Sequence, residues 1–418
     1  MPKPTLQSID RRAMRTFRNR RRNRSRIIIA VVALAMVVAG AAWAVSDGFL
    51  GKGTSSPTAS TAAVTTTPAA SAPTTPVAVS TAATDAAATS SATATADPSR
   101  PATITVAGAG DMIFDRQVKA LIKLAGGEAP LARVAHLLKT ADIAIANLES
   151  TLASSGSKNA DKDVTFRGDP RGIESLKIAE LDAVSLANNH VLDYGPEPLL
   201  DTIKALDSAG IGHAGAGKDK TAAWTPATIE RKGTTTAYLA YSHIVPAGFI
   251  AQDDRAGFAS GRRDMNLVED AIREAKGTHD YVIVSFHWGV EYTDHPTAEQ
   301  VKNAHRAIDA GADMVLAHHP HVIQGVEFYK DGLIAYSLGD FVFDHYSRKT
   351  GEAFILNASM GPDGITDVTA IPVYLDEYGR PEVVTGSEGR SILKRLKAIS
   401  SPLGTTVKIT GDTARIRP

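Results

Sequence analysis

The chain has 418 residues and an even charge balance, with 45 basic and 45 acidic side chains and no cysteine. Ten of the bases but only one of the acids lie in residues 1–45, so the rest of the chain carries nine more acids than bases. A body with this negative excess is poorly suited to nucleic acid, whose binding depends on neutralising phosphates. Without cysteine there are no disulfides, and an apolar core must stabilise the fold.

The first 45 residues combine a basic tail with an apolar run. Residues 1–26 carry nine arginines, and residues 27–45 are uncharged and close to the roughly 20 residues that cross a bilayer as a helix. The positive-inside rule places the tail in the cytoplasm and the rest of the chain outside. We therefore predict a single-pass signal-anchor in the cell membrane. A cleavable signal peptide is the alternative, because Ala42-Trp43-Ala44 has the form of a cleavage site.

Residues 46–100 are rich in Ala, Thr, Ser and Pro and carry little charge. Such a segment cannot bury enough apolar surface to fold, so we predict a disordered linker that holds a domain away from the membrane. The folded domain is expected in residues 101–375. Residues 376–418, with one amphipathic helix and two short strands, are expected to form an accessory segment.

The folded domain alternates short apolar runs with helical patterns, which is typical of βαβ units and a largely parallel sheet. The first strands are expected at 104–110, 142–149, 182–187, 281–286 and 314–317. Helices are expected at roughly 116–124, 131–138, 197–208, 267–275 and 298–310. Antiparallel strands at 322–329, 333–337, 354–360 and 365–374 would then form the second sheet of a two-sheet α/β sandwich.

The most distinctive stretch is Ala317-His318-His319-Pro320-His321, which follows an apolar strand. Pro320 disfavours a helix and biases His319 towards an extended backbone, on which alternate side chains point the same way. His319 and His321 can therefore enter one site, and neutral imidazole is a common ligand of zinc, manganese and iron. A loop of surface histidines is the alternative interpretation.

Each of the five strands before this loop ends next to a side chain that can bind metal, at the sheet edge where α/β proteins bind ligands. Carboxylate, amide and imidazole together suit one or two Mn²⁺, Fe or Zn²⁺ ions, and contain too much nitrogen for calcium. With Glu149 as the bridge, two ions would polarise a substrate and activate water. The predicted metal ligands are Asp111, Glu149, Asn189, His287, His319 and His321.

The motifs around these ligands resemble those of the CapA family, which is associated with synthesis of capsular poly-γ-glutamate. They are Gly110-Asp111-Met112, Asn147-Leu148-Glu149, Ala187-Asn188-Asn189-His190, His287-Trp288-Gly289, His318-His319-Pro320-His321 and Ser337-Leu338-Gly339-Asp340-Phe341. The resemblance covers roughly residues 103–345 and implies a calcineurin-like metallophosphatase fold. It makes the six predicted ligands counterparts of the metallophosphatase ligands. It also implies that His190 meets the substrate's oxygen or leaving group.

The chain departs from the metallophosphatase and family patterns at three positions. Ile113 stands where the first metallophosphatase motif has a histidine, and Glu149 stands where the bridging aspartate is expected. Asp340 replaces the asparagine that is usual in the family. The missing histidine makes a mononuclear site an alternative to a dinuclear one.

Five further side chains are candidates for catalysis or substrate binding. His190 is the predicted acid or charge-stabilising group, and Asp193 would orient its ring or cap the following helix. Arg167 offers a fork for a carboxylate or phosphate, but a surface arginine before a turn is the alternative. Glu291 and Tyr292 would face the substrate or form a turn.

We therefore expect a membrane-anchored, extracytoplasmic protein of the bacterial cell surface with a metal-dependent hydrolase-type site. It would act on, or handle, an anionic polymer such as poly-γ-glutamate. Cleavage of a phosphoester or a γ-glutamyl amide is left open. The alternatives are a non-catalytic export or scaffold subunit of a membrane synthase and a cell-wall phosphoesterase.

Overall fold

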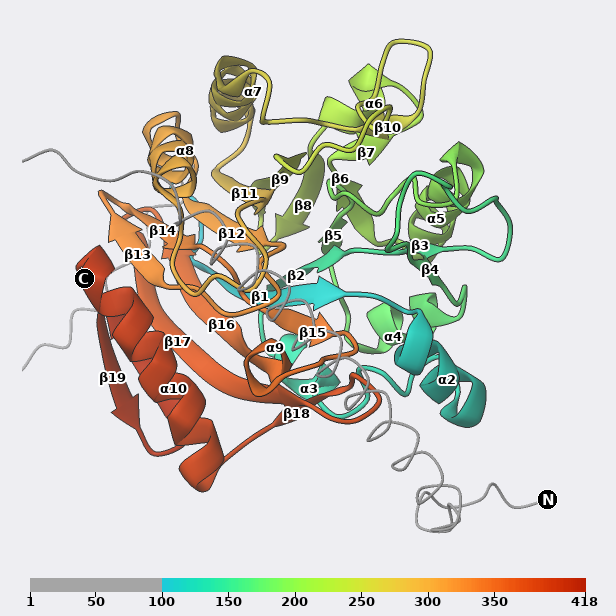
Figure 1. Ribbon diagram of the computed structural model, residues 1–418. Helices are drawn as coiled ribbons and strands as arrows, with labels where there is room; N and C mark the ends of the chain where they lie inside the picture. Colours follow the sequence, from blue (N-terminus) through green and yellow to red (C-terminus); the bar gives the residue numbers. More distant parts are fainter. Residues whose placement is uncertain (1–99) are drawn as a thin grey trace, which may run out of the picture. The chain divides into compact units, whose positions relative to one another are not determined.

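The computed structural model describes residues 100–418, which fold around two mixed β-sheets (Figure 1). The predicted basic tail, membrane span and linker lie outside the described residues, apart from Arg100. Among the helices of the described part, none combines the length and the apolar character that a bilayer span needs.

The larger sheet has ten strands, and β1 (Ile104–Met112) lies at its centre between β2 (Ile143–Leu148) and β16 (Glu352–Gly361). From β1, the parallel strands β2, β5 (Ala183–Ser185) and β6 (Gly212–Ala214) follow in order, as the βα pattern predicts. On the other side of β1 the sheet is antiparallel. It contains β16, β17 (Gly364–Leu375), β18 (Pro381–Val383), β19 (Thr406–Thr410) and β20 (Thr413–Arg417), while β15 (Asp340–Val342) pairs in parallel with the end of β1.

The smaller sheet has six strands in the order β13-β14-β12-β11-β9-β8. These are β8 (Ala227–Arg231), β9 (Thr234–Ser242), β11 (Tyr281–His287), β12 (Met314–His318), β13 (Val326–Tyr329) and β14 (Gly332–Ala335). The prediction that residues 322–374 build a separate second sheet is wrong. Only β13 and β14 join this sheet, whereas β16 pairs with β1 in the larger sheet and β17 pairs with β16.

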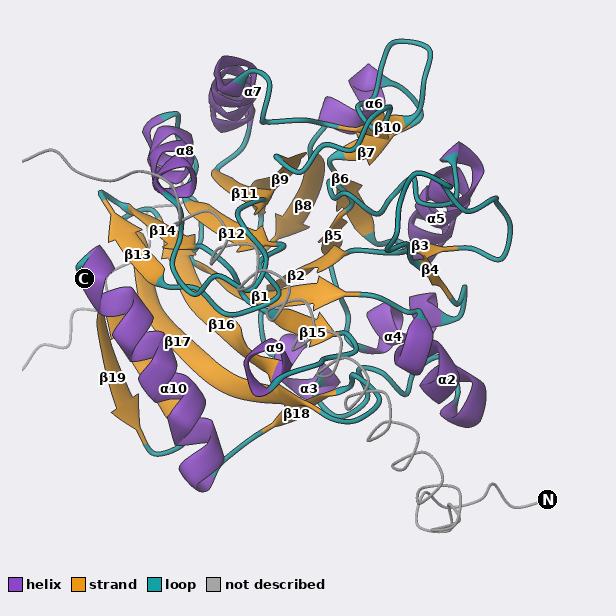
Figure 2. Cartoon of the chain, in the orientation of Figure 1, coloured by secondary structure: helices purple, strands orange, loops and turns teal. Residues whose placement is uncertain are grey.

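The sheets pack face to face, and side chains alternate between two cores as expected for strands. Ile283 and Leu316 contribute to the core between the sheets, whereas Val282 and Val284 belong to a second core on the outer face of the smaller sheet. Figure 2 shows α7 (Met265–Thr278) and α8 (Ala298–Asp309) on that outer side. The other helices are α2 (Arg116–Ala125), α3 (Ala135–Leu138), α4 (Gly172–Ile178), α5 (Pro196–Ala209), α6 (Lys220–Trp224), α9 (Arg348–Gly351) and α10 (Gly386–Ser400).

The helix predicted at 131–138 is shorter in the structure, where only α3 is helical. The short strands are β3 (Thr151–Leu152), β4 (Arg167–Gly168), β7 (Ala216–Gly217) and β10 (Gly257–Phe258), with a 3-10 turn at Ser401–Leu403.

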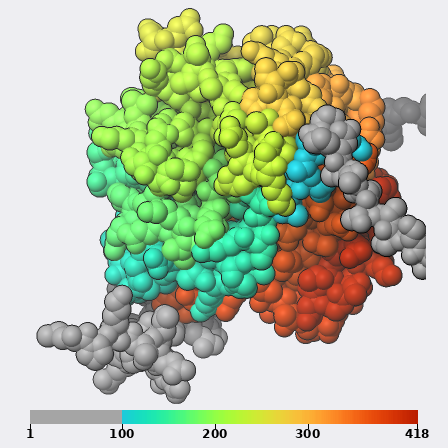
Figure 3. Space-filling model, turned by 180° about the vertical axis from the view of Figure 1, so that it is seen from behind, coloured from blue at the N-terminus to red at the C-terminus, as the bar shows by residue number. Residues whose placement is uncertain are grey.

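Residues 376–418 extend the larger sheet and its core. β18 and β20 pair with β17, and α10 packs against strands of both sheets, including β17 and β13. Leu393 and Leu396 of α10 are fully buried in the main core. From behind, Figure 3 shows the C-terminal residues, orange to red, beside the blue start of the described chain, where Arg100 pairs with Asp363 at 2.6 Å.

Candidate metal centre

The carboxyl ends of parallel strands from both sheets meet at one place. Asp111 lies near the end of β1, Glu149 directly follows β2, and Asn189 follows β5, all in the larger sheet. The smaller sheet contributes His287 from the end of β11 and the loop after β12. The structure thus brings together the six predicted ligands, which come from positions 111 to 321 and are all buried.

Glu149 is the centre of this cluster. Its side chain is fully buried, and neither carboxylate oxygen has a hydrogen-bond partner among the described residues. Imidazole nitrogens of His287, His190 and His321 lie 3.5, 3.8 and 3.9 Å from its Oε1. Burial and the negative charge of Asp111 raise the pKa of Glu149 well above its usual value. The ionised form of a buried carboxylate needs a nearby positive charge or hydrogen-bond donors, and the described residues supply no donor to Glu149.

Asp111 is held in place from two sides. Its Oδ1 accepts a hydrogen bond from Asn147 Nδ2 at 2.7 Å, and its Oδ2 accepts one from the backbone N–H of His319 at 3.0 Å. Asn188 in turn donates to Asn147 Oδ1 at 3.2 Å. His287 Nε2 lies 2.7 Å from Asn189 Oδ1, so these two predicted ligands also contact each other. Asn147 therefore orients the predicted ligand Asp111, and Asn188 orients Asn147.

The histidine loop does not have the expected extended backbone. His319 has a φ of +96° and His321 a φ of +55°, so the prediction of an extended His319 is wrong. The hydrogen bond that Asp111 accepts from the His319 N–H overrides the local bias of Pro320. Both imidazoles still enter the cluster, with their ring centroids 5.8 Å apart. Left-handed backbone at non-glycine residues costs about 1–3 kcal/mol each and concentrates at functional sites.

Asp340 is a site residue that sequence reasoning did not assign. It accepts a hydrogen bond from His321 Nδ1 at 2.8 Å, which leaves His321 Nε2 to face Glu149. Burial raises the pKa of Asp340 to about 7. Burial alone would lower the pKa of His321, but Asp340 and Glu149 raise it well above its usual value. The departure from asparagine at this position was the signal in the sequence.

Glycine at position 110 allows this arrangement, because a Cβ there would lie 1.9 Å from the carbonyl oxygen of Gly339. The close approach lets β15 pair with the end of β1, where Asp340 stands opposite Asp111. His318 is a second unassigned neighbour: its Nδ1 lies 3.4 Å from Asp111 Oδ1 and has no hydrogen-bond partner among the described residues.

The donor set fits a divalent cation. Carboxylate oxygens and imidazole nitrogens without any thiolate suit manganese, iron or zinc. The buried carboxyls of Glu149, Asp111 and Asp340 place negative charge that a bound cation would offset. In each of three overlapping groups, the candidate ligand atoms all lie within 4.8 Å of one another. These groups are Glu149, His319 and His321; Asp111, His321 and Asp340; and Asp111, Glu149 and His287.

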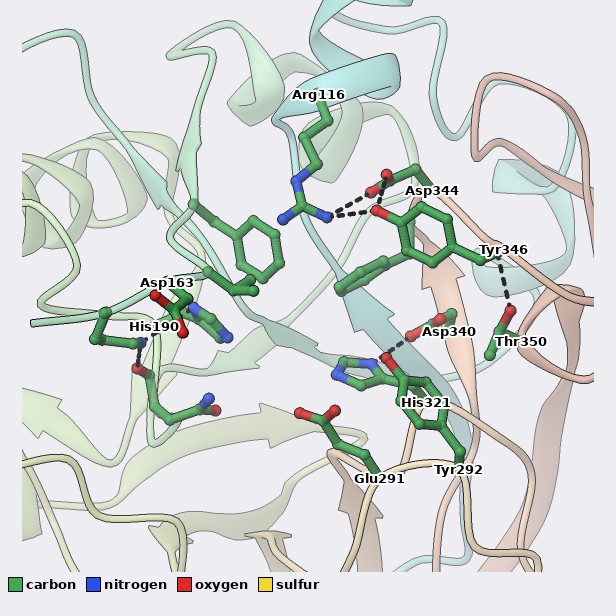
Figure 4. Close-up of a pocket in the computed structure, with 15 residues that line it drawn as sticks. Arg116, Asp163, His190, Glu291, Tyr292, His321, Asp340, Asp344, Tyr346 and Thr350 are labelled. Carbon is green, nitrogen blue, oxygen red and sulfur yellow. Dashed lines mark hydrogen bonds and ion pairs between the residues drawn. The ribbon is translucent and has the colours of Figure 1, made fainter. Parts of the chain in front are cut away.

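A cavity of about 290 Å³ opens onto this cluster (Figure 4). His190 lines it, and its Nδ1 donates to Asp193 Oδ2 at 2.6 Å, so Nε2 is directed towards the cluster. Burial lowers the pKa of His190 to about 4, although Asp193 opposes the shift. Asp193 is fully buried and also accepts a hydrogen bond from the backbone N–H of Phe166 at 2.8 Å. It orients the imidazole and does not cap α5, whose N-cap is Gly195.

Lys162 completes this arrangement and was not found from the sequence. Its ammonium group contacts Asp193 and the carbonyl oxygen of Asn189, and lies 3.4 Å from His190 Nδ1. It comes from the polar loop between β3 and β4, where no periodicity or motif marks it. Lys162 therefore neutralises the buried carboxylate that holds His190.

The three predicted substrate-binding residues divide into two groups. Glu291 and Tyr292 line the cavity. Arg167 does not line it, and its Nη1 donates to the carbonyl oxygens of Ser155 at 2.9 Å and Gly156 at 3.2 Å. The proposed anion fork is thus occupied by backbone oxygens, and Arg167 braces the loop that carries Lys162.

The fold and site define an α/β protein with a buried, metal-compatible cluster at the common edge of two sheets. The family model "Bacterial capsule synthesis protein PGA_cap" matches residues 105–345, more than half of the chain. The chain belongs to this family, and the predicted CapA membership is confirmed.

Two curated relatives carry related names. The chain is 32% identical to "Capsule biosynthesis protein CapA" of Bacillus anthracis, over 68% of this chain and 70% of that protein. It is 28% identical to "PGA biosynthesis protein CapA" of Bacillus subtilis, over 66% and 72%. Among solved structures it is similar to a 5'-nucleotidase precursor from Thermus thermophilus, with a TM-score of 0.42 and 15% identity, over 72% of this chain and 59% of that one.

Proposed function

We propose that the protein is a membrane-anchored, extracytoplasmic hydrolase-type member of the family that cleaves an anionic cell-surface polymer such as poly-γ-glutamate. The observation that carries this proposal is Glu149, a buried carboxylate without a hydrogen-bond partner among the described residues, beside two imidazoles, His190 and His321, that line the cavity. A merely structural carboxylate would be hydrogen-bonded. The names of the relatives, which refer to capsule and PGA biosynthesis, support the choice of polymer.

One or two Mn, Zn or Fe ions would be held by Asp111, Glu149, Asn189, His287, His319 and His321, and would supply Lewis-acid polarisation of a carbonyl or phosphoryl oxygen. Asp193 and His190 would supply the acid–base part of the reaction. Asp193 fixes the His190 tautomer with the proton on Nδ1, so that Nε2 is available at the cavity for a substrate oxygen or leaving group. The ring of Phe166 packs against the imidazole of His190, with the two ring centroids 4.2 Å apart.

A non-catalytic subunit that guides polymer out of a membrane synthase is the second candidate. Ile113 favours it, because this residue replaces a metallophosphatase histidine and is fully buried with Phe166, Phe343 and Leu375 in an apolar cluster. One ligand position of a two-metal site is therefore filled by hydrocarbon. A polymer-handling subunit needs a rigid site but no open coordination position.

The activity test compares wild type with His190→Ala in full-length protein, loaded with Mn²⁺, Zn²⁺ or Fe²⁺. We expect the variant to keep its metal and to turn over γ-glutamyl amides or phosphoesters about 10²–10⁴-fold more slowly, the usual contribution of a placed acid or base. His136→Ala, on the exposed surface of α3, is the matched control and should leave turnover unchanged. Turnover of phosphoesters alone would favour the cell-wall phosphoesterase. No turnover at any metal loading would favour the polymer-handling subunit.

The membrane location rests on residues 1–45 and has a separate test. Protease added outside intact cells or spheroplasts should release a fragment that begins within residues 46–100. Protection of the C-terminal body from outside, with cleavage of the tail, would reverse the proposed orientation.

A further inference from the structure

Arg116 stands at the cavity with unused hydrogen-bond donors. It is the first residue of α2 and is labelled in Figure 4. Its guanidinium carbon lies 4.5 Å from the centroid of the Phe166 ring. Nη1 donates to the Tyr346 hydroxyl at 2.8 Å and lies 3.5 Å from Asp344 Oδ1. Within residues 100–418, Nε and Nη2 have no acceptor, although an arginine offers five N–H donors. A further acceptor can therefore bind without displacing the existing contacts.

The backbone of Arg116 is strained in the same way as the site. Eight non-glycine residues of the described chain have a positive φ, and four of these belong to the cluster or line the cavity. The four are Arg116 at +51°, Tyr292 at +63°, His319 and His321. Such conformations cost about 1–3 kcal/mol and persist where the surroundings require them. The strained backbone of Arg116 therefore indicates that this residue belongs to the site.

The mouth of the cavity is also unusually apolar for an exposed surface. Tyr346, Tyr292 and Val164 line it, and 71%, 55% and 48% of their respective surfaces are exposed. Exposed large apolar side chains that gather in one place mark a binding surface. Methylene groups of a ligand would pack on these rings.

The charged side chains around the cavity determine where an anionic group of a ligand would bind. Arg116 and Lys162 are the arginine and lysine of its lining, but Lys162 is already occupied by Asp193 and a backbone carbonyl. Figure 4 shows Asp163 and Glu291 on other sides of the cavity from Arg116. Asp344 also lines the cavity beside Arg116, but it contacts Nη1 only, so Nε and Nη2 remain as donors for an anionic group.

We propose that Arg116 forms an oxyanion subsite that binds a carboxylate or phosphate of the substrate chain, while the adjoining apolar spacer packs on Tyr292 and Tyr346. This inference rests on the proposed function, because it assigns the charged group beside the reacting bond. A γ-linked glutamate chain has this pattern, with a carboxylate on each α-carbon and two methylenes between that carbon and the next amide. The planar fork of arginine suits either oxyanion.

Equilibrium binding to full-length, manganese-loaded protein tests the subsite without requiring turnover. The probes are a γ-glutamyl pentamer, the same pentamer with its α-carboxylates amidated, and inorganic phosphate. Arg116→Gln should weaken pentamer binding by about 10- to 100-fold, as expected for loss of a charged hydrogen bond, with little effect on the amidated pentamer. Arg116→Lys should restore part of the loss. Arg133→Gln, which removes a surface pair with Glu382, is the matched control.

Loss of phosphate affinity alone would identify a phosphate-bearing substrate as the source of the oxyanion. Unchanged binding of both anions, an equal loss in Arg133→Gln, or no anion binding by wild type would overturn the subsite. Arg116-dependent binding without any hydrolysis would refute the hydrolase proposal and leave the subsite standing. Melting curves of all variants establish that each is folded.

Discussion

The two ends of the parallel strands use the same residue type in opposite ways. Near the carboxyl ends, Asp111 of β1 and Glu149 after β2 are fully buried, and Glu149 has no hydrogen-bond partner among the described residues. At the amino ends, an aspartate stands just before each of four strands, and every one is paired within the protein. These are Asp142 before β2, Asp182 before β5, Asp280 before β11 and Asp313 before β12.

Each amino-end aspartate joins its strand to a neighbouring one. Asp313 Oδ2 accepts from the Val282 N–H at 2.7 Å and from Lys276 at 2.8 Å. Asp142 Oδ2 accepts from the Thr105 N–H at 2.8 Å and from Lys232 at 2.7 Å. Residue type therefore does not mark a candidate functional carboxylate here, but burial does differ, because Asp111 and Glu149 are fully buried and the amino-end aspartates are half-buried or exposed. A second difference is that the protein supplies hydrogen-bond donors to every amino-end aspartate but to neither oxygen of Glu149.

The largest expected effect is at the carboxyl end. Replacing His319 and His321 together with Ala removes two candidate ligands, so the purified protein should lose its transition metal. Added Mn²⁺ or Zn²⁺ should stabilise wild type by about 2.7 kcal/mol at 100 times Kd and should leave the double variant unchanged. Elemental analysis and thermal melts measure both effects. Unchanged metal content would contradict the metal site and support the alternative that these histidines form a loop without a metal.

A smaller effect is expected at the amino end. Asp313→Asn removes the charge that binds Lys276 and weakens the acceptor for Val282, which should lower the free energy of unfolding by about 1–2 kcal/mol. Metal content should not change. Asp331→Asn, in the exposed turn before β14, is the control and should be neutral. Loss of metal in Asp313→Asn would mean that the two ends are not independent.

The smallest effect is a pH dependence at Asp142. Burial alone would raise the pKa of Asp142, but hydrogen bonds from Lys232 and Thr105 lower this pKa below the ordinary value. A lowered folded-state pKa adds stability above the unfolded pKa of about 3.9, and this is lost as the pH falls through the folded value. Asp142→Asn should therefore flatten the acid limb of urea-unfolding stability by about 0.5 kcal/mol, since the pair is partly exposed. An acid limb as steep as in wild type would contradict the assignment.

The strands that consist of a short continuous apolar run could be predicted from the sequence. The sequence also predicted that six candidate ligands lie at one sheet edge. It missed β9, because Thr234–Ser242 is buried on both faces yet contains threonine, alanine and tyrosine in place of a continuous apolar run. It missed the His319 conformation, because the hydrogen bond that sets it is donated by the His319 N–H to a residue 208 positions away. Lys162 could not be found for the same reason, since its contacts are all tertiary.

The position of β1 has a consequence for the order in which the chain can fold. The most N-terminal described strand lies between β2 and β16, so the central sheet cannot close before residue 361 has been synthesised. Pairings this distant in sequence form slowly, because the loop entropy is lost before the contacts are gained. The central sheet of the nascent chain therefore stays incomplete through most of its synthesis.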